Sequence, residues 1–147
     1  MSNTKISALT AATAALAADE LPINEAGLSK KLTVAQIHAY IYTQAIYAQL
    51  SASVNDWNPA GLGTCTVIRI TADNAYNITG ITAQTDGTII RLLNLSNYSI
   101  TLPFYSGSSS VANRFQTPNQ ASVVIRSRGS VEIYYSRSDG NWYVLAI

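Results

Sequence analysis

The chain has 147 residues, of which 48% are hydrophobic and only 12% are charged, with a formal net charge of +1. A soluble domain usually carries about 25% charged residues, so the polarity of this chain comes instead from Ser, Thr, Asn and Gln. The near-neutral balance argues against an electrostatic nucleic-acid binder, and the many aliphatic and aromatic residues argue against disorder.

Residues 1–33 are rich in Ala and Thr at first and turn-like later. The Ala-rich start contains Lys5, but Ser and Thr interrupt its few strong hydrophobes, so the pattern does not favour a cleaved secretory signal. Further on, two short runs, Glu20–Asn24 and Leu28–Leu32, flank a turn that contains Gly27. This arrangement is consistent with a small β-hairpin or with an irregular arm, and the pattern does not separate the two.

A helix is predicted over residues 34–50. Thr33 suits the N-cap and Gln36 suits its capping-box partner, and no Gly or Pro interrupts the run. The apolar positions form two stripes with only a narrow polar face, which is typical of a helix buried on most sides. The helix either lies in a core or packs against copies of itself. We favour oligomerisation, through the stripe Val34, Ile37, Ile41 and Ala48.

The segment from Leu32 to Asn55 has no formal charge. It nevertheless contains three Gln residues and His38, which are unfavourable in hydrocarbon, so we expect no membrane insertion. Residues 51–61 are predicted to be a linker, because Asn, Asp, Pro and Gly break the pattern there.

Residues 62–147 consist of short β-rich runs separated by turn residues. Their spacing predicts an antiparallel β-sandwich or barrel, and Asp139-Gly140 is a strong hairpin signal. The fold class expected is therefore mainly β, with an N-terminal arm, one α-helix and a C-terminal antiparallel, jelly-roll-like β-sandwich. The strand candidates are Thr64–Thr71, Tyr76–Ile81, Thr88–Leu95, Ser99–Leu102, Ser110–Phe115, Ser122–Ile125, Ser130–Tyr135 and Trp142–Ile147.

Catalytic residue types are scarce. Cys65 is the only cysteine and His38 the only histidine, so a nucleophile–base pair or a metal site would depend on one imidazole. His38 has no acidic residue within a helical turn to orient it. We expect no enzymatic activity, no metal and no cofactor.

The acidic residues of the β region are disfavoured as a catalytic pair, although spacing alone does not exclude a glycosidase arrangement. Three of the four lie beside Asn or Gly in turn contexts, where Asp caps its own backbone. These acids are Asp73, Asp86, Glu132 and Asp139.

Tyrosine is unusually frequent, with nine Tyr against two Phe and two Trp. Tyrosine rings among Asn, Ser and Gly suit a sugar-binding or protein-binding surface, but Tyr is also simply a good strand former. The candidate ligand surface comprises Tyr98, Tyr105 and Tyr134.

Two stretches resemble bacteriophage virion proteins, namely short tail fibres, head fibres and capsid-decorating proteins. The first comprises Thr4–Leu9, Asp19–Ile23 and Lys30–Thr33, and it looks like the N-terminal segment that attaches such proteins to the particle. The chain departs from the family pattern at Thr10, where the family often has Pro.

The second stretch comprises Ile81–Thr82, Asp86–Asn94 and Ala112–Phe115. It is similar to the β-sandwich tips of phage fibres, which are generally homotrimeric. For Asn113, Arg114 and Phe115 the resemblance implies a structural role, as a buried anchor rather than a receptor site.

The resemblance implies a structural component of a phage virion, assembled in the host cytoplasm. It would be a homotrimeric short fibre or spike, attached to other virion proteins through residues 1–33 and held together by the helix. Its head would bind a host-surface glycan, without cofactor or catalytic residues. The alternative within this class is a capsid-decorating protein that stabilises the head, and the alternative of another class is a carbohydrate-binding module.

Overall fold

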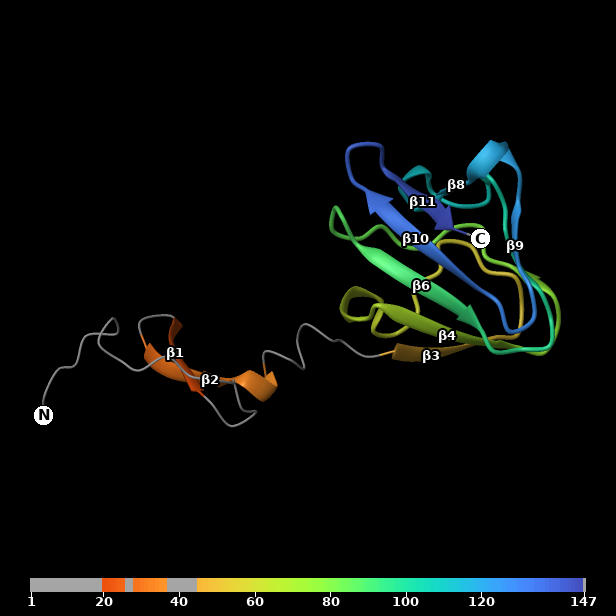
Figure 1. Cartoon of the computed structure of the whole chain (residues 1–147). Helices are drawn as coiled ribbons and strands as arrows, with labels where there is room; N and C mark the ends of the chain where they lie inside the picture. Colours follow the sequence, from red (N-terminus) through yellow and green to blue (C-terminus); the bar gives the residue numbers. More distant parts are fainter. Residues whose placement is uncertain (1–19, 26–27, 37–44, 147) are drawn as a thin grey trace, which may run out of the picture. The chain divides into compact units, whose positions relative to one another are not determined.

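The computed structural model describes residues 20–25, 28–36 and 45–146, and within these ranges its secondary structure is mainly β. The chain divides into two compact units, Met1–Tyr42 and Thr43–Ile147, which we call the N-terminal unit and the β unit (Figure 1). The predicted mainly β class is confirmed. No helix in the described ranges is long and apolar enough to cross a membrane.

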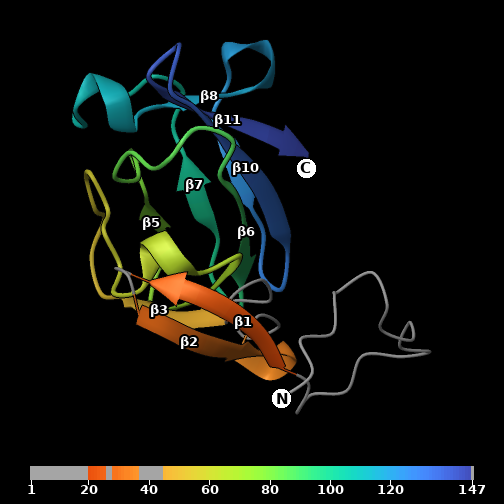
Figure 2. The same ribbon diagram turned by 90° about the vertical axis from the view of Figure 1, so that its left-hand side faces the viewer.

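The N-terminal unit contains an antiparallel hairpin. Strand β1 (Glu20–Glu25) pairs with β2 (Leu28–Thr33) along its whole length (Figure 2). An exposed ion pair joins Lys31 Nζ to Glu20 Oε1 at 2.6 Å across the hairpin. Exposed pairs of this kind contribute only about 0–1 kcal/mol. Of the two alternatives that the sequence left open, the β-hairpin is confirmed.

A helical turn begins after β2, where the sequence predicted a helix to start. The Thr33 backbone N–H donates to Gln36 Oε1 (2.8 Å), and the Gln36 backbone N–H donates to Thr33 Oγ1 (3.1 Å). These reciprocal bonds form a capping box, and residues 34–36 are helical. Val34 of the predicted oligomer stripe lies in this turn.

The helix predicted over residues 34–50 is wrong at its C-terminal end. Ala45–Leu50 form strand β3 instead, so Ala48 lies on a strand. Ile37 and Ile41 lie outside the described residues. The stripe expected to hold a trimer together is therefore not one continuous helical face.

Tertiary pairing explains why this segment becomes a strand. All six residues of β3 pair with the neighbouring strand β4. Leu50 is buried while Tyr47 and Gln49 are exposed, which is the period of two that a strand produces. Helix propensities separate ordinary residues by at most about 0.7 kcal/mol each, so a complete ladder with burial of one face outweighs them.

Two sheets make up the β unit. One has six strands in the order β3-β4-β6-β10-β11-β8, and the other has three in the order β5-β7-β9. The connections include three short 3-10 turns, η2 (Leu62–Thr64), η3 (Val111–Asn113) and η4 (Pro118–Gln120). The strands are β3 (Ala45–Leu50), β4 (Val67–Ala72), β5 (Tyr76–Asn77), β6 (Ile89–Asn94), β7 (Ile100–Leu102), β8 (Phe115–Gln116), β9 (Val123–Ile125), β10 (Ser130–Ser136) and β11 (Asn141–Ala146).

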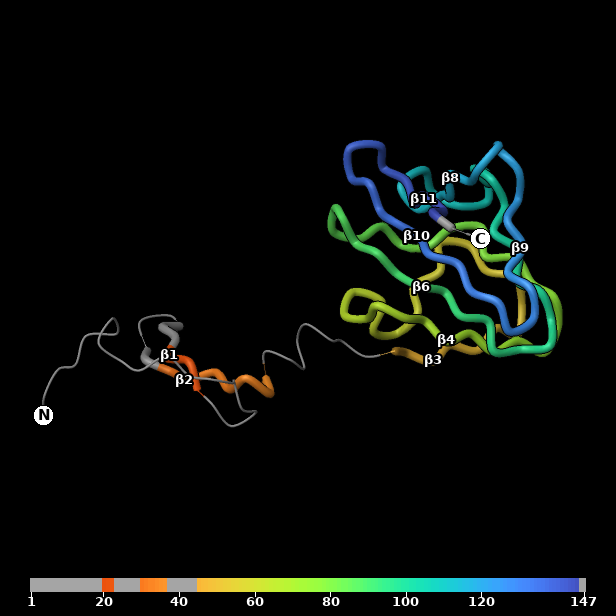
Figure 3. The backbone as a smooth tube through the Cα atoms, in the orientation of Figure 1, coloured from red at the N-terminus to blue at the C-terminus, as the bar shows by residue number. Residues whose placement is uncertain are grey.

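The chain winds through the two sheets in successive passes, and the strands of these passes stack in parallel (Figure 3). Val54 pairs with Ile78 and Tyr76 pairs with Ile100, so equivalent positions recur 24 residues apart. This part of the β unit is solenoid-like. The predicted antiparallel, jelly-roll-like arrangement is therefore wrong for β3, β4, β5, β6 and β7 where they stack on one another. Antiparallel strand pairs occur at β6-β10-β11 and at β7-β9.

Two further predictions are corrected. The predicted linker, residues 51–61, belongs to the first pass, because Val54 and Trp57 form β-bridges to the second pass. The strand predicted over Ser110–Phe115 is mostly the turn η3, which a backbone hydrogen bond from Asn113 N to Ser110 O (2.9 Å) closes. Only its last residue enters β8.

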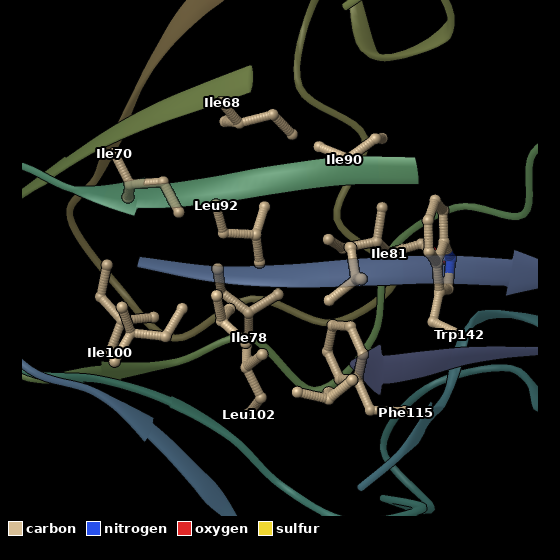
Figure 4. Packing of buried hydrophobic residues seen from close by; sticks show 14 of the residues in the cluster. Ile68, Ile70, Ile78, Ile81, Ile90, Leu92, Ile100, Leu102, Phe115 and Trp142 are labelled. Atoms are coloured by element: carbon tan, nitrogen blue, oxygen red, sulfur yellow. The ribbon is translucent and has the colours of Figure 1, made fainter. Parts of the chain in front are cut away.

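The core of the β unit is built by side chains from both sheets (Figure 4). Burying one such aliphatic side chain contributes about 1.5–3 kcal/mol, so the core stabilises the passes as one body. Fully buried members from three strands are Ile68 and Ile70 of β4, Ile90 and Leu92 of β6, and Ile100 and Leu102 of β7.

The hairpin predicted at Asp139-Gly140 is confirmed. It joins β10 to β11, and Gly140 adopts the left-handed conformation with φ of 62°. Trp142 follows at the start of β11 and is fully buried. Its Nε1–H donates to the carbonyl oxygen of Ile81 at 2.8 Å, which ties the last strand to the second pass.

Candidate ligand-binding site

The three tyrosines of the predicted ligand surface do not form one surface. Tyr98 follows the C-terminal end of β6, where its carbonyl accepts a hydrogen bond from Asn94 Nδ2 (2.7 Å). Tyr134 lies on β10 opposite Ile89, at the N-terminal end of β6. The length of β6 therefore separates them, on the order of 15 Å. Tyr105 lies elsewhere, with its ring against the Arg114 guanidinium, whose Cζ is 4.8 Å from the ring centroid.

The predicted anchor residues hold the segment before β8 to the rest of the unit. Asn113 donates through Nδ2 to Asp56 Oδ1 (2.8 Å) and accepts at Oδ1 from the Ala83 backbone N–H (2.8 Å). Arg114 Nε donates to the Ser109 carbonyl (2.8 Å). Phe115 is fully buried in the core.

The polar side chains around Asp56 are hydrogen-bonded to one another and to backbone groups of the β unit. The Asp56 carboxylate accepts hydrogen bonds from the Ser110 backbone N–H (2.8 Å), from Ser110 Oγ (3.0 Å) and from Asn113. These bonds, led by the one from Asn113, lower the pKa of Asp56 below its ordinary value of 3.8. Ser109 Oγ accepts from the Asp56 backbone N–H (3.0 Å) and contacts Thr79 Oγ1 (2.7 Å). The cluster therefore joins two loops to each other.

The four acidic residues considered as a glycosidase pair are hydrogen-bonded to five different partner residues. Asp73 accepts from Tyr76, Asp86 from the Arg137 backbone N–H, Glu132 from Arg91, and Asp139 from Ser136 and Tyr143. Within the described ranges, no group of three or more His, Cys, Asp or Glu side chains is placed to hold a metal ion.

A shallow depression of about 490 Å³ lies where β8, β11 and the turn η4 meet. Its open shape suits a ligand bound at the surface rather than one enclosed by the protein. The lining residues include two with aromatic rings, three with side-chain amides and two with hydroxyls, and none of them carries a charge. The lining residues are Phe104, Gln116, Thr117, Pro118, Asn119, Gln120, Tyr143 and Val144.

The hydroxyl of Thr117 has no hydrogen-bond partner. Thr117 is only 9% exposed, and its Oγ1 is a buried oxygen left unpaired. A buried hydroxyl without a partner destabilises a protein by about 1–3 kcal/mol, so such a group in a native fold calls for an explanation. Because this oxygen is buried, it lies beneath the surface of the depression, where a bound ligand would not reach it.

The backbone beside Thr117 is strained. Asn119 and Gln120 both have φ of 55°, in the left-handed region that residues other than glycine seldom occupy. Asparagine adopts this region more readily than most residues, so the strain falls mainly on Gln120, where it costs about 1–3 kcal/mol; strain of this kind is found preferentially at functional sites. The strained turn holds both side-chain amides at the rim of the depression, where the exposed residues Asn119 and Gln120 are in contact with solvent.

Tyr143 gives the depression a fixed aromatic ring. Its hydroxyl donates to Asp139 Oδ2 (3.2 Å), and burial followed by this hydrogen bond raises the pKa of the phenol. Tyr143 pairs with Tyr134 on β10 and with Gln116 on β8. Tyr134, one of the three tyrosines of the predicted ligand surface, is therefore the cross-strand neighbour of a residue that lines the depression.

None of the residues that line the depression belongs to the ligand surface predicted from the sequence. In the sequence, Pro118-Asn119 reads as a break between strands, and Thr117 and Phe104 carry no signal of their own. The site exists because the parallel pairing of β8 with β11 brings Gln116 beside Tyr143. Strand order of this kind is not readable from local patterns.

No protein-family model, curated protein or solved structure matches the chain. The class is defined here by the fold and the depression: the described residues form a mainly β protein with an uncharged candidate binding site whose lining includes two aromatic rings.

Proposed function

We propose that this chain is a non-enzymatic binding protein whose β unit holds a neutral carbohydrate in the depression beside Thr117. More particularly, it is a structural component of a bacteriophage virion, with the N-terminal unit attached to the particle and the β unit presented to a host-surface glycan.

The observation that carries the proposal is a lining of two aromatic rings and three side-chain amides with no charged side chain. A sugar ring has apolar C–H faces that pack on aromatic rings and hydroxyls that both donate and accept hydrogen bonds. Tyr143 and Phe104 offer the rings, and amides offer both donors and acceptors. An anionic ligand would find no cation in this lining, so a neutral sugar fits better.

The virion assignment is supported by two observations that are independent of the depression. Residues 1–33 resemble the attachment segments of phage fibres and decorating proteins, and part of this region folds as a hairpin in a compact unit of its own. A separate attachment unit suits a protein that is fixed to a particle at one end. The depression favours a host-binding fibre over a capsid-decorating protein, which needs no ligand.

Titration of the purified full chain with a panel of neutral and acidic oligosaccharides tests the carbohydrate proposal. We expect binding of neutral members, and about a tenfold weaker affinity for Tyr143→Ala, which removes one of the two rings that a sugar would pack on. Tyr98→Ala is the matched control, because it removes an exposed tyrosine away from the depression. No binding at millimolar sugar, a preference for acidic sugars, or equal weakening in the control would refute the site.

Particle assembly tests the virion assignment separately. A chain lacking residues 1–33 should fail to co-purify with particles, and particles without the protein should lose adsorption to host cells. Particles that keep adsorption but lose physical stability would identify a capsid-decorating protein instead. Retention of the shortened chain on particles would contradict the attachment role.

A further inference from the structure

The β unit leaves one long sheet edge uncovered among its described residues. The far edge of β8 is met by a β-bridge between Phe104 and Phe115. The far edge of β5 is met by Val54, whose N–H donates to the Asn77 carbonyl at 2.9 Å. β9 has only three residues and is followed closely by the exposed side chains of Arg126 and Arg128. Short length and charge are common protections of an edge.

Strand β3 has none of these protections. It is six residues long, it pairs with β4 without a bulge, and its sequence contains no charge, Pro or Gly. Within the described ranges no strand lies on its other side. Its inward side chains Ile46 and Ala48 are only half-buried, although the equivalent side chains of β4 are fully buried. A further strand beside β3 would pair the free backbone groups and cover these side chains.

We infer that β3 pairs antiparallel with β3 of a second copy of this chain across a twofold axis at Ala48. In an antiparallel pair, two residues that face each other point to the same side of the sheet, so in two copies of β3 their numbers differ by an even number. The twofold axis lies midway between them and therefore passes through a residue, not between two residues. At Ala48, Ile46 lies opposite the second Leu50 on the inner side, and Tyr47 lies opposite the second Gln49 on the outer side. The pairs are thus aliphatic with aliphatic and hydroxyl with amide.

Charge supports a second copy as the occupant. A twofold axis places identical groups near each other, so a charged edge would repel its copy, and β3 carries no charge. A positive charge does lie beside β3, on Arg69 of β4. Its guanidinium donates a hydrogen bond to the Tyr47 hydroxyl, and its Cζ lies 5.0 Å from the Tyr47 ring centroid. In this register the two Tyr47 side chains are diagonal neighbours, about 7–8 Å apart, so the two guanidiniums are separated by about one Debye length at physiological salt, about 8 Å, and their exposed position lets salt screen much of the repulsion.

The same geometry limits the assembly to a dimer. A twofold contact uses the same edge of both chains and leaves no second edge for growth. The two six-stranded sheets join into one continuous sheet. This inference does not depend on carbohydrate binding or on the virion assignment.

The mass of the full chain in solution, measured by light scattering and sedimentation equilibrium, tests the inference. We expect a dimer of twice 15.8 kDa, and at least tenfold weaker association for Gln49→Lys, which places a charge at the edge. Ile89→Lys is the matched control, because Ile89 is 52% exposed on the outer side of the interior strand β6. A monomer at all concentrations, a trimer, or dissociation by Ile89→Lys but not Gln49→Lys would overturn the pairing.

Cysteine cross-linking tests the register. Under mild oxidation, Tyr47→Cys mixed with Gln49→Cys should form an intermolecular disulfide, whereas Tyr47→Cys alone should not. Both positions are exposed, so folding is not at risk, and the native Cys65 is buried. Cross-linking of Tyr47→Cys to itself would place the axis elsewhere and contradict the proposed register.

Discussion

Gly80 is the position where a single methyl group should do the most damage. It is buried beside the turn η3, and a Cβ added there would lie 2.5 Å from the Asn113 carbonyl oxygen and 2.7 Å from Ser109 Oγ. Real Cβ atoms essentially never approach other heavy atoms closer than 3.0 Å. The Asn113 carbonyl has little freedom to retreat, because it accepts the Ile81 N–H at 2.9 Å.

The magnitude for Gly80→Ala follows from these contacts. Overpacking a tight site costs about 1–3 kcal/mol, and weakening the bond to the Asn113 carbonyl adds about 1 kcal/mol. The lower entropy of the unfolded Ala chain returns about 0.4–1 kcal/mol. The net loss of unfolding free energy is therefore about 1–3.5 kcal/mol, which lowers the urea midpoint by about 0.5–2.5 M for a slope near 1.5–2 kcal/mol/M.

Urea unfolding followed by tryptophan fluorescence measures this loss. Gly107→Ala is the matched control, since nothing lies within 4 Å of a Cβ at that position, and its stability should be unchanged or slightly higher. A Gly80→Ala midpoint equal to that of the wild-type chain, or an equal loss in the Gly107→Ala control, would refute the reasoning.

Three further predictions concern other parts of the β unit. The hydrogen bond from Asn113 is the main cause of the lowered pKa of Asp56 in the folded chain. The stability that the ionised Asp56 contributes is therefore complete above its ordinary pKa of 3.8 and is lost as the pH falls through the folded pKa. In unfolding midpoints measured across pH, Asp56→Asn should flatten this acid dependence. The Cys65 thiol is 6% exposed and burial raises its pKa, so a thiol reagent should modify it far more slowly in the folded chain than in denaturant, and equal rates would contradict its burial. Trp142→Phe removes the hydrogen bond to the Ile81 carbonyl and should destabilise the unit by about 3 kcal/mol in the same urea assay.

The start of the predicted helix and its end illustrate what local signals can predict. The capping box at Thr33 and Gln36 depends on side chains three residues apart, and it forms as predicted. The extension to Leu50 depends on what else the segment can pair with. Residues 45–50 join β4, which starts 17 residues after β3 ends, and no local pattern carries that information.

The sequence by itself determined the mainly β class, the positions of most strands, the N-terminal hairpin as one of two alternatives, and the turn at Asp139-Gly140. These features depend on alternation and turn chemistry over a few residues. Only the tertiary structure decided the parallel stacking of the passes, the strand at 45–50, and the depression that Thr117 and Tyr143 share. The physical reason is that strand pairing joins distant segments through backbone groups common to every residue, so it leaves little trace in the side-chain pattern.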